Sequence, residues 1–177
     1  MSRYRRAFAP GGTFFFTVNL ADRRSELLIG QIDLLRTAYR RVMHALPFET
    51  IAICILPDHL HAIWRLPTDD GEFSNRWRQI KAEFSRPLRV QANRSQSKQQ
   101  KGVKGIWQRR FWEHQIRDEH DLQQHVDYVH YNPVKHGWVQ QVREWPYSSF
   151  HRYVSRGELP LDWAGGVCVD NADSFGE

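Results

Sequence analysis

A chain of 177 residues, 41% of them hydrophobic, is long enough to fold as one domain around a sizeable core. No apolar run is long enough to span a membrane, and the basic residues 1–6 are not followed by the continuous apolar core of a secretion signal. With two cysteines, Cys54 and Cys168, a disulfide framework is not expected, and the composition favours a cytoplasmic protein.

Positive charge is concentrated in one block of the sequence. Residues 76–117 include twelve Lys or Arg and two acidic residues, which gives this block +10 and leaves −5 for the rest of a chain whose total is +5. A solvated basic face is the ordinary explanation, but such a block is also typical of proteins that bind a polyanion. Aromatic residues interleaved with the cations favour nucleic acid, because bases can stack on them. They are Trp77, Phe84, Trp107, Phe111 and Trp112.

Hydrophobic periodicity and turn residues predict alternating strands and helices. The predicted strands are 13–20, 48–56, 59–66 and 106–116, and the predicted helices are about 27–46, 74–87 and a third from Asp118 or Asp121 to Pro133–Gly137. We expect the second strand to be central because its end is almost entirely apolar.

This order, β-α-β-β-α-β followed by a helix, predicts an α+β fold of the ferredoxin-like, split-βαβ type. It has a four-stranded antiparallel sheet with helices on one face and an additional C-terminal helix. The third strand should lie near the sheet centre. We expect residues 1–163 to form a single domain with a mobile basic loop at 91–105, followed by a flexible tail at 164–177.

Two histidines in the third predicted strand are candidate metal ligands. His59 and His61 are separated by one residue, so their side chains should point to the same face, roughly 6–7 Å apart along the strand. Leu60 and Ala62 should face the core on the opposite side. This spacing lets two imidazoles bind one divalent ion, although two half-exposed histidines on a sheet are common without a metal.

The last predicted helix offers a partner for this pair. At about 100° per residue, Leu122, Val126 and Val129 form its core face, and a neighbouring stripe carries Asp121, His125, Tyr128 and Asn132. We expect Tyr128 to be exposed and able to meet the histidines. Periodicity alone would make it an ordinary boundary tyrosine. Tyr131 points almost directly away from the core and is the alternative to Tyr128 as a reactive tyrosine.

Three blocks of residues carry a family resemblance. They are His59-Leu60-His61, the segment from Trp107 to His114 (Trp-Gln-Arg-Arg-Phe-Trp-Glu-His), and the segment from Tyr128 to Gly137 (Tyr-Val-His-Tyr-Asn-Pro-Val-Lys-His-Gly). In their order and spacing, from about residue 4 to residue 163, the chain resembles the REP-associated tyrosine transposases. These are a branch of the HUH single-stranded DNA endonucleases. The loop at 91–105 matches no motif of the family.

The resemblance implies a mechanism and a set of site residues. Tyr128 would attack a DNA phosphodiester, leaving a 5′-phosphotyrosine and a 3′-hydroxyl. His59, His61 and Asn132 would hold Mg²⁺ or Mn²⁺, which would polarise the phosphate. The implied substrates are single-stranded DNA hairpins formed by repetitive palindromic sequences, and the resemblance favours a monomer associated with the nucleoid.

Charge placement adds candidate DNA contacts. We expect phosphate contacts from basic residues of the leader, of the second predicted helix and of the two late motifs. They are Arg5, Arg6, Arg76, Arg78, Lys81, Arg109, Arg110 and Lys135.

Two other functions fit the same residues. One is a non-catalytic single-stranded nucleic-acid-binding module that uses aromatic residues on its sheet. The other is a metal-dependent nuclease that uses His59 and His61 with water as the nucleophile.

Overall fold

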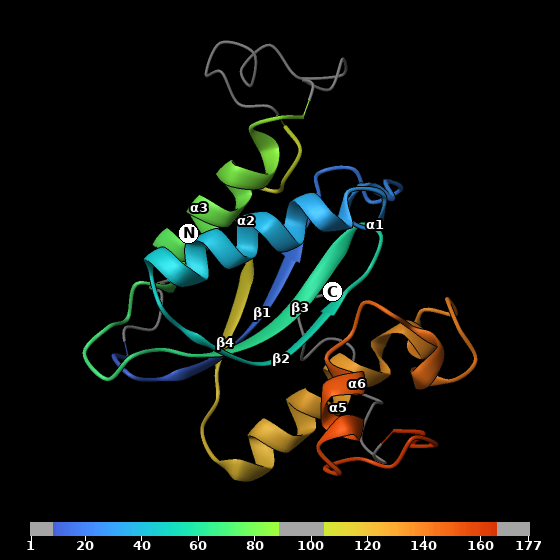
Figure 1. The fold of residues 1–177 in the computed structure, drawn as a ribbon. Coiled ribbons are helices and arrows are strands. Elements are labelled where there is room, and N and C mark those ends of the chain that lie inside the picture. The colour runs from blue at the N-terminus through green and yellow to red at the C-terminus, as the bar shows by residue number, and fades with distance from the viewer. Residues whose placement is uncertain (1–8, 89–104, 166–177) are drawn as a thin grey trace, which may run out of the picture.

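The structure is a computed structural model, in which residues 9–88 and 105–165 are described. Its strands and helices follow the predicted order (Figure 1). They are β1 (Thr13–Asn19), α1 (Leu27–Gly30), α2 (Ile32–Ala45), β2 (Glu49–Ile55), β3 (His59–Arg65), α3 (Phe73–Ser85), β4 (Trp112–Gln115), α5 (Glu119–Lys135), the 3₁₀ turn η1 (Val142–Glu144) and α6 (Phe150–Ser155). Among the described helices, none is both long and apolar enough to cross a membrane.

The sheet has the strand order β2-β3-β1-β4, and all neighbouring strands are antiparallel. This confirms the ferredoxin-like prediction and the near-central position of β3. The prediction that β2 is central is wrong, because β2 is an edge strand. Residues 147–149 cover its outer edge. The Ile55 amide of β2 donates to the Tyr147 carbonyl, and the Ser149 amide donates to the Ile53 carbonyl of β2. This cover explains why an edge strand has such an apolar sequence.

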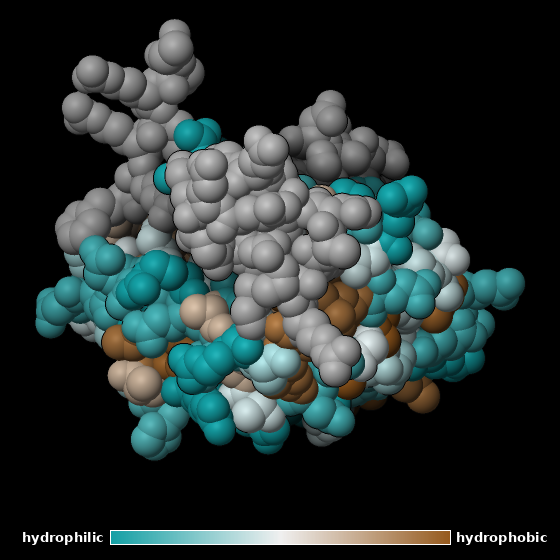
Figure 2. Space-filling model, turned by 90° about the horizontal axis from the view of Figure 1, so that it is seen from above, coloured by the Kyte–Doolittle hydropathy of each residue, from teal (hydrophilic) through white to brown (hydrophobic). Residues whose placement is uncertain are grey.

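Each face of the sheet packs against its own set of helices (Figure 1). Side chains alternate along β1, so Phe14 and Phe16 pack in the core beneath α2 and α3, whereas Phe15 packs in a second core with Val126 and Val129 of α5. The helices α2 and α3 therefore cover one face of the sheet, and the additional C-terminal helix α5 covers part of the other. Where the described residues are visible from above, their surface is mainly hydrophilic, with smaller apolar patches (Figure 2).

Three element boundaries differ from the prediction. The first predicted helix is broken at Gln31 into α1 and α2. The fourth strand is short: before Trp112 only an isolated bridge between Leu20 and Trp107 continues the pairing. Pro133 lies inside the last turn of α5 instead of ending it. The helix is followed by Gly137, whose φ of +71° suits a residue without a side chain. The predicted loop and tail lie almost entirely outside the described residues.

Candidate active site

Helix α5 presents a line of polar side chains to the sheet. Its N-terminus is capped by Asp118, whose side chain accepts a hydrogen bond of 2.8 Å from the Asp121 amide. The predicted stripe of Asp121, His125, Tyr128 and Asn132 is buried against the sheet. The expectation that Tyr128 is exposed is wrong, since only 1% of its surface is accessible. Helical periodicity identifies neighbours on one helix, but the extent of the covering sheet depends on the whole fold.

Tyr128 meets the histidine pair through His61. The centroids of the Tyr128 and His61 rings are 5.2 Å apart in an edge-to-face arrangement, and the ring of Phe15 lies 6.0 Å from that of Tyr128. Lys135, the last residue of α5, lies beside Tyr128, about two helical turns later in the chain. Its Nζ donates a hydrogen bond of 3.1 Å to the Tyr128 hydroxyl and lies 4.7 Å from the ring centroid. The late helix and the mid-sheet strand thus converge on one site.

The two histidines face the same side of the sheet, as their spacing predicts. Their ring centroids are 5.0 Å apart, while Leu60 and Ala62 pack in the opposite core. Each Nδ1 has a partner on the protein: the Asp58 carboxylate lies 2.8 Å from that of His59, and the Thr17 hydroxyl lies 3.0 Å from that of His61. These bonds orient the rings.

Asp58 is itself held in place by a cation. Arg23 Nε lies 2.9 Å from the Asp58 carboxylate. Burial by itself would raise the pKa of Asp58, but the hydrogen bond and charge of His59, together with Arg23, hold that pKa below its ordinary value. The carboxylate therefore stays ionised and can accept the Nδ1–H of His59 at neutral pH.

Asn132, the third predicted metal ligand, lies between the two residues that contact the histidine pair, Tyr128 of α5 and His136 just after it. Asn132 is completely buried, one turn after Tyr128 and one turn before His136. The ring of His136 lies 5.3 Å from that of His59, and the ring of Tyr128 lies beside His61. Asn132 therefore belongs to the segment of α5 that faces both histidines.

These residues fit a divalent metal ion. With Nδ1 of each imidazole bonded to Asp58 or Thr17, Nε2 is the nitrogen suited to ligation, which is the usual arrangement of metal-binding histidines. Two imidazoles and an amide oxygen form a neutral set of three ligands, which leaves positions for phosphate oxygens. Such N and O ligands are compatible with magnesium, manganese or zinc.

A second cluster of metal-ligating residues lies along the same stripe. His114 on β4 joins Asp121 and His125 of α5, and their potential ligand atoms all lie within 4.8 Å of one another. The Asp121 carboxylate is 2.9 Å from His114 Nε2 and 3.1 Å from His125 Nδ1, and it also accepts from the amide and Nε of Arg117. Burial raises the pKa of Asp121, but the bonds from His114 and Arg117 outweigh it and hold the pKa at about 2.

Sequence reasoning missed this cluster. The spacing of Asp121 and His125 shows that they are neighbours on a helix, but only the fold brings His114 of β4 to them. In the structure, the contacts form a hydrogen-bonded network that fixes the start of α5 against β4. A metal ion here would have to compete with the Arg117 guanidinium for the carboxylate.

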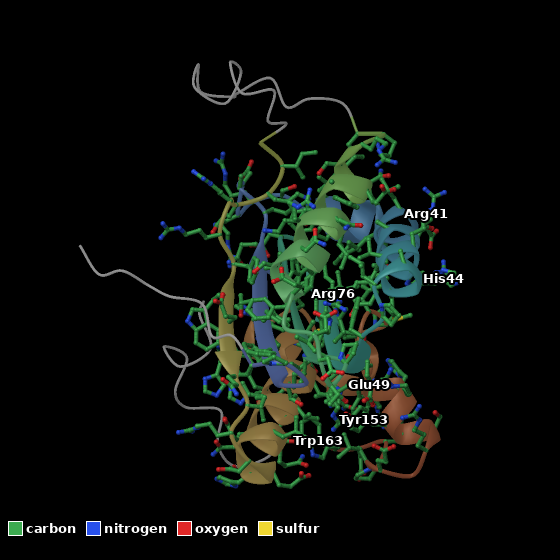
Figure 3. All side chains as sticks on the ribbon, turned by 90° about the vertical axis from the view of Figure 1, so that its left-hand side faces the viewer. Arg41, His44, Glu49, Arg76, Tyr153 and Trp163 are labelled. Atoms are coloured by element: carbon green, nitrogen blue, oxygen red, sulfur yellow. The ribbon has the colours of Figure 1, made fainter. Side chains whose placement is uncertain are left out.

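Arg76 was predicted to contact DNA, and the structure contradicts this. Its side chain is buried in the interior between helices and sheet, whereas Arg41 and His44 of α2 project outward (Figure 3). The guanidinium donates to the Leu46 and Pro47 carbonyls at 3.1 and 2.8 Å and forms a two-pronged ion pair with Asp70, with bonds of 3.0 and 2.6 Å. Arg76 is therefore a structural residue, because a buried arginine must satisfy its donors within the protein.

The other predicted DNA contacts have varied positions. Arg78, Arg109 and Arg110 are exposed. Lys81 donates to the Gln108 carbonyl at 3.0 Å, which joins α3 to the segment that carries Arg109 and Arg110. Lys135 lies in the active site, in contact with Tyr128. Arg5 and Arg6 lie outside the described residues.

The rival nucleophile, Tyr131, is directed elsewhere. It lines a cavity with Val142 and Trp163, and its ring lies so close to Gly165 that a Cβ added there would be 2.7 Å from the ring. Tyr131 is therefore packed against the C-terminal segment, whereas Tyr128 contacts His61.

The chain is similar to known proteins over most of its length. The family model described as "Transposase IS200 like" matches residues 16–132. The chain is 52% identical over 167 residues to the REP-associated tyrosine transposase of Escherichia coli (strain K12), covering 94% of this chain and 93% of the relative. A second relative, from Haemophilus influenzae and also named as a REP-associated tyrosine transposase, is 49% identical over 166 residues. The match covers 93% of this chain and 94% of the relative.

A solved structure gives the same result. A REP-associated tyrosine transposase bound to a REP hairpin superposes with a TM-score of 0.86 at 51% identity, covering 100% of this chain and 98% of that chain. Sequence and fold therefore identify the same family. The chain belongs to the IS200-like transposases and, among them, to the REP-associated tyrosine transposases.

Proposed function

We propose that this transposase is a metal-dependent single-stranded DNA endonuclease and strand transferase that works through a 5′-phosphotyrosine on Tyr128. The observation that carries the proposal is the contact of the Tyr128 ring with His61, at 5.2 Å, in a buried site where Lys135 holds the phenol hydroxyl. A nucleophile, a candidate metal site and a cation for the developing charge therefore lie together.

His59, His61 and Asn132 would hold the divalent ion, Mg²⁺ or Mn²⁺. When bound, such an ion acts as a Lewis acid toward the scissile phosphate. Asp58 and Thr17 keep the two imidazoles oriented through their Nδ1 atoms. Arg78, Lys81, Arg109 and Arg110, with Arg5 and Arg6 of the leader, would contact DNA phosphates.

The Tyr128 oxygen forms a bond to phosphorus, and the bond from phosphorus to the 3′-oxygen of the preceding nucleotide breaks. The phenol loses its proton, and the departing 3′-oxygen gains one. A phenol has an ordinary pKa near 10, so neutral solution holds little phenolate. Lys135 places a positive charge where the oxygen becomes negative. The reverse attack by a 3′-hydroxyl reseals the strand, and because the phosphotyrosine conserves the bond energy, no ATP is needed.

The substrate class follows from the relatives. The solved relative is bound to a REP hairpin, and we propose that this chain acts on hairpins of repetitive palindromic DNA as a monomer. Such an enzyme would work in the cytoplasm, at the nucleoid.

The test is formation of a covalent adduct with a labelled hairpin oligonucleotide, with and without Mg²⁺, on a denaturing gel. Tyr128→Phe should abolish the adduct, and Tyr131→Phe, the matched control on the same helix, should retain it. The reverse result would remove Tyr128 as nucleophile. Cleavage without an adduct would favour attack by water, and binding without cleavage would favour a non-catalytic module.

A further inference from the structure

A second cavity lies on the other face of the sheet from Tyr128. Its volume is about 320 Å³. It is bounded by α2, by the C-terminal half of β2, by the start of β3 and by residues 146–152. Leu60 of β3 lines it, while the neighbouring His59 and His61 point to the active site. The two sites are therefore back to back across one strand. None of the residues proposed for catalysis lines this cavity.

The charges around this cavity are of one sign. Its lining includes Arg36, Arg40 and Arg152. Within the described part of the chain, no Asp or Glu lines it. Arg36 and Arg40 are exposed, one turn apart on α2. The Arg36 guanidinium lies 3.6 Å from Asp33, outside the lining, so part of its charge is offset. The remaining excess of cations favours an anionic ligand.

Arg152 is fixed at the inner end of the cavity. Its guanidinium donates to the carbonyls of Thr50 and Ile51 on β2. These bonds hold the guanidinium in place, so its positive charge is a fixed part of the cavity wall.

The walls suit a flat ring. Leu35, Ile55 and Leu60 make one side apolar, and Tyr147 supplies an aromatic surface over which the Arg36 guanidinium lies, 5.9 Å from the ring centroid. The hydroxyl of Tyr39 is held by Thr50. A ring that stacks on Tyr147 would take the place of the exposed Arg36 guanidinium and would move that cation to its edge. Aromatic surfaces with cations beside them are the combination used for single-stranded nucleic acids.

We propose that this cavity holds one nucleotide of the DNA strand beyond the segment in the active site, with its base against Tyr147 and its phosphate between Arg36 and Arg40. The inference rests on the proposed function, because it takes the DNA strand as the ligand. A cavity of this volume is at the lower end of the range for small-ligand sites, which suits a single nucleotide. The strand would pass the β2–β3 turn, beside which His59 begins β3.

Salt dependence of binding gives the sharpest test. Affinity would be measured in a Tyr128→Phe background, so that cleavage does not interfere, for two oligonucleotides: a hairpin with a single-stranded flank and the same hairpin without it. For single strands each phosphate contact adds about 0.7 to the slope of log K against log [salt]. Because the two arginines would share one phosphate, Arg36→Ala/Arg40→Ala should lower the slope by about 0.7 for the flanked hairpin and leave it unchanged for the unflanked one.

The matched control is Arg41→Ala/Arg156→Ala, which removes two exposed arginines of the same charge, one of them next to Arg40 on α2. An equal fall in slope for the control, or no difference between the two hairpins, would overturn the proposal. Wild-type protein from the same preparation must form the Tyr128 adduct. If it does not, the proposed function fails; if it does and the slope is unchanged, only the nucleotide site fails.

The aromatic wall has a test of its own. Tyr147→Leu should weaken binding of the flanked hairpin by roughly 5- to 100-fold, and Tyr147→Phe should retain it, because stacking needs the ring and not the hydroxyl. Thermal unfolding of both variants checks that the edge of β2 is intact. Equal binding by a free deoxynucleoside monophosphate, with no gain from the flank, would show a site for free nucleotides and overturn the assignment to the DNA strand.

Discussion

The Nζ atom of Lys135 donates a hydrogen bond of 3.1 Å to the hydroxyl of Tyr128, seven residues earlier in α5. The sequence suggested a phosphate contact for this lysine, whereas the structure places it on the proposed nucleophile. Lys135→Met should slow adduct formation by about 100-fold, because the positive charge beside the developing phenolate is lost. Lys135→Arg should restore part of the rate. The measurement is the single-turnover rate with a labelled hairpin at saturating enzyme.

Affinity separates this role from simple phosphate binding. If Lys135 acts on Tyr128, Lys135→Met should leave the salt dependence of hairpin binding almost unchanged in the Tyr128→Phe background. A fall of about 0.7 in the salt slope, with a normal adduct rate at saturation, would instead identify a phosphate contact.

Asp58 and Thr17 should act through the histidines. Asp58→Asn or Thr17→Val removes a partner of Nδ1 on His59 or His61, and we expect the Mn²⁺ concentration for half-maximal adduct formation to rise about 10- to 100-fold. Asp22→Asn is the control, since this exposed carboxylate is paired with Arg24 and not with a histidine. A lower maximal rate at an unchanged Mn²⁺ midpoint would contradict the assigned role.

Metal removal distinguishes the two clusters of ligating residues on α5. EDTA should prevent adduct formation, and added Mg²⁺ or Mn²⁺ should restore it. His61→Ala should abolish the metal-dependent reaction, whereas His114→Ala should retain it, because His114 belongs to the network around Asp121. Loss of metal dependence in His114→Ala, with His61→Ala still active, would move the metal site to the second cluster.

The ion pair of Arg76 and Asp70 should contribute to stability and not to DNA binding. The hydrogen bond from Arg76 lowers the pKa of Asp70. Because the folded-state pKa is the lower one, this stabilisation is present above the ordinary carboxyl pKa and is lost as pH falls through the lower value. Asp70→Asn should cost about 3 kcal/mol at pH 7, the low end for a buried pair because Asp70 is partly exposed.

Urea unfolding at pH 7 and at successively lower pH measures this effect. The difference in the free energy of unfolding between wild type and Asp70→Asn should shrink in acid, and hairpin affinity at pH 7 should be equal in the two proteins. A constant difference across pH would show that the carboxylate charge is not responsible.

Local patterns predicted the parts of this protein that depend on near neighbours. The shared face of His59 and His61 follows from the two-residue period of a strand, and the stripe of α5 follows from the helical period. The order of strands and helices was enough for the ferredoxin-like topology. The proposed site rests on such local patterns, combined with the motif around Tyr128.

Long-range contacts account for what the sequence did not predict. The apolar character of β2 suggested a central strand, but a segment about 90 residues later covers its edge. Arg76 lies in a basic block and resembles its exposed neighbours, although Asp70 and two carbonyls hold it inside. Burial of Tyr128 and the approach of His114 to Asp121 likewise depend on how α5 crosses the sheet.

The pairing of β2 with residues 147–149 has a consequence for synthesis of the chain. The Ile53 amide bonds to the Ser149 side chain across a separation of 96 residues, so a ribosome completes β2 on the order of 5 to 20 seconds before its cover emerges. During that interval the nascent sheet exposes an apolar strand edge of the kind that joins other chains. Aggregation during expression should therefore respond to translation speed through this stretch and to chaperones acting on the growing polypeptide.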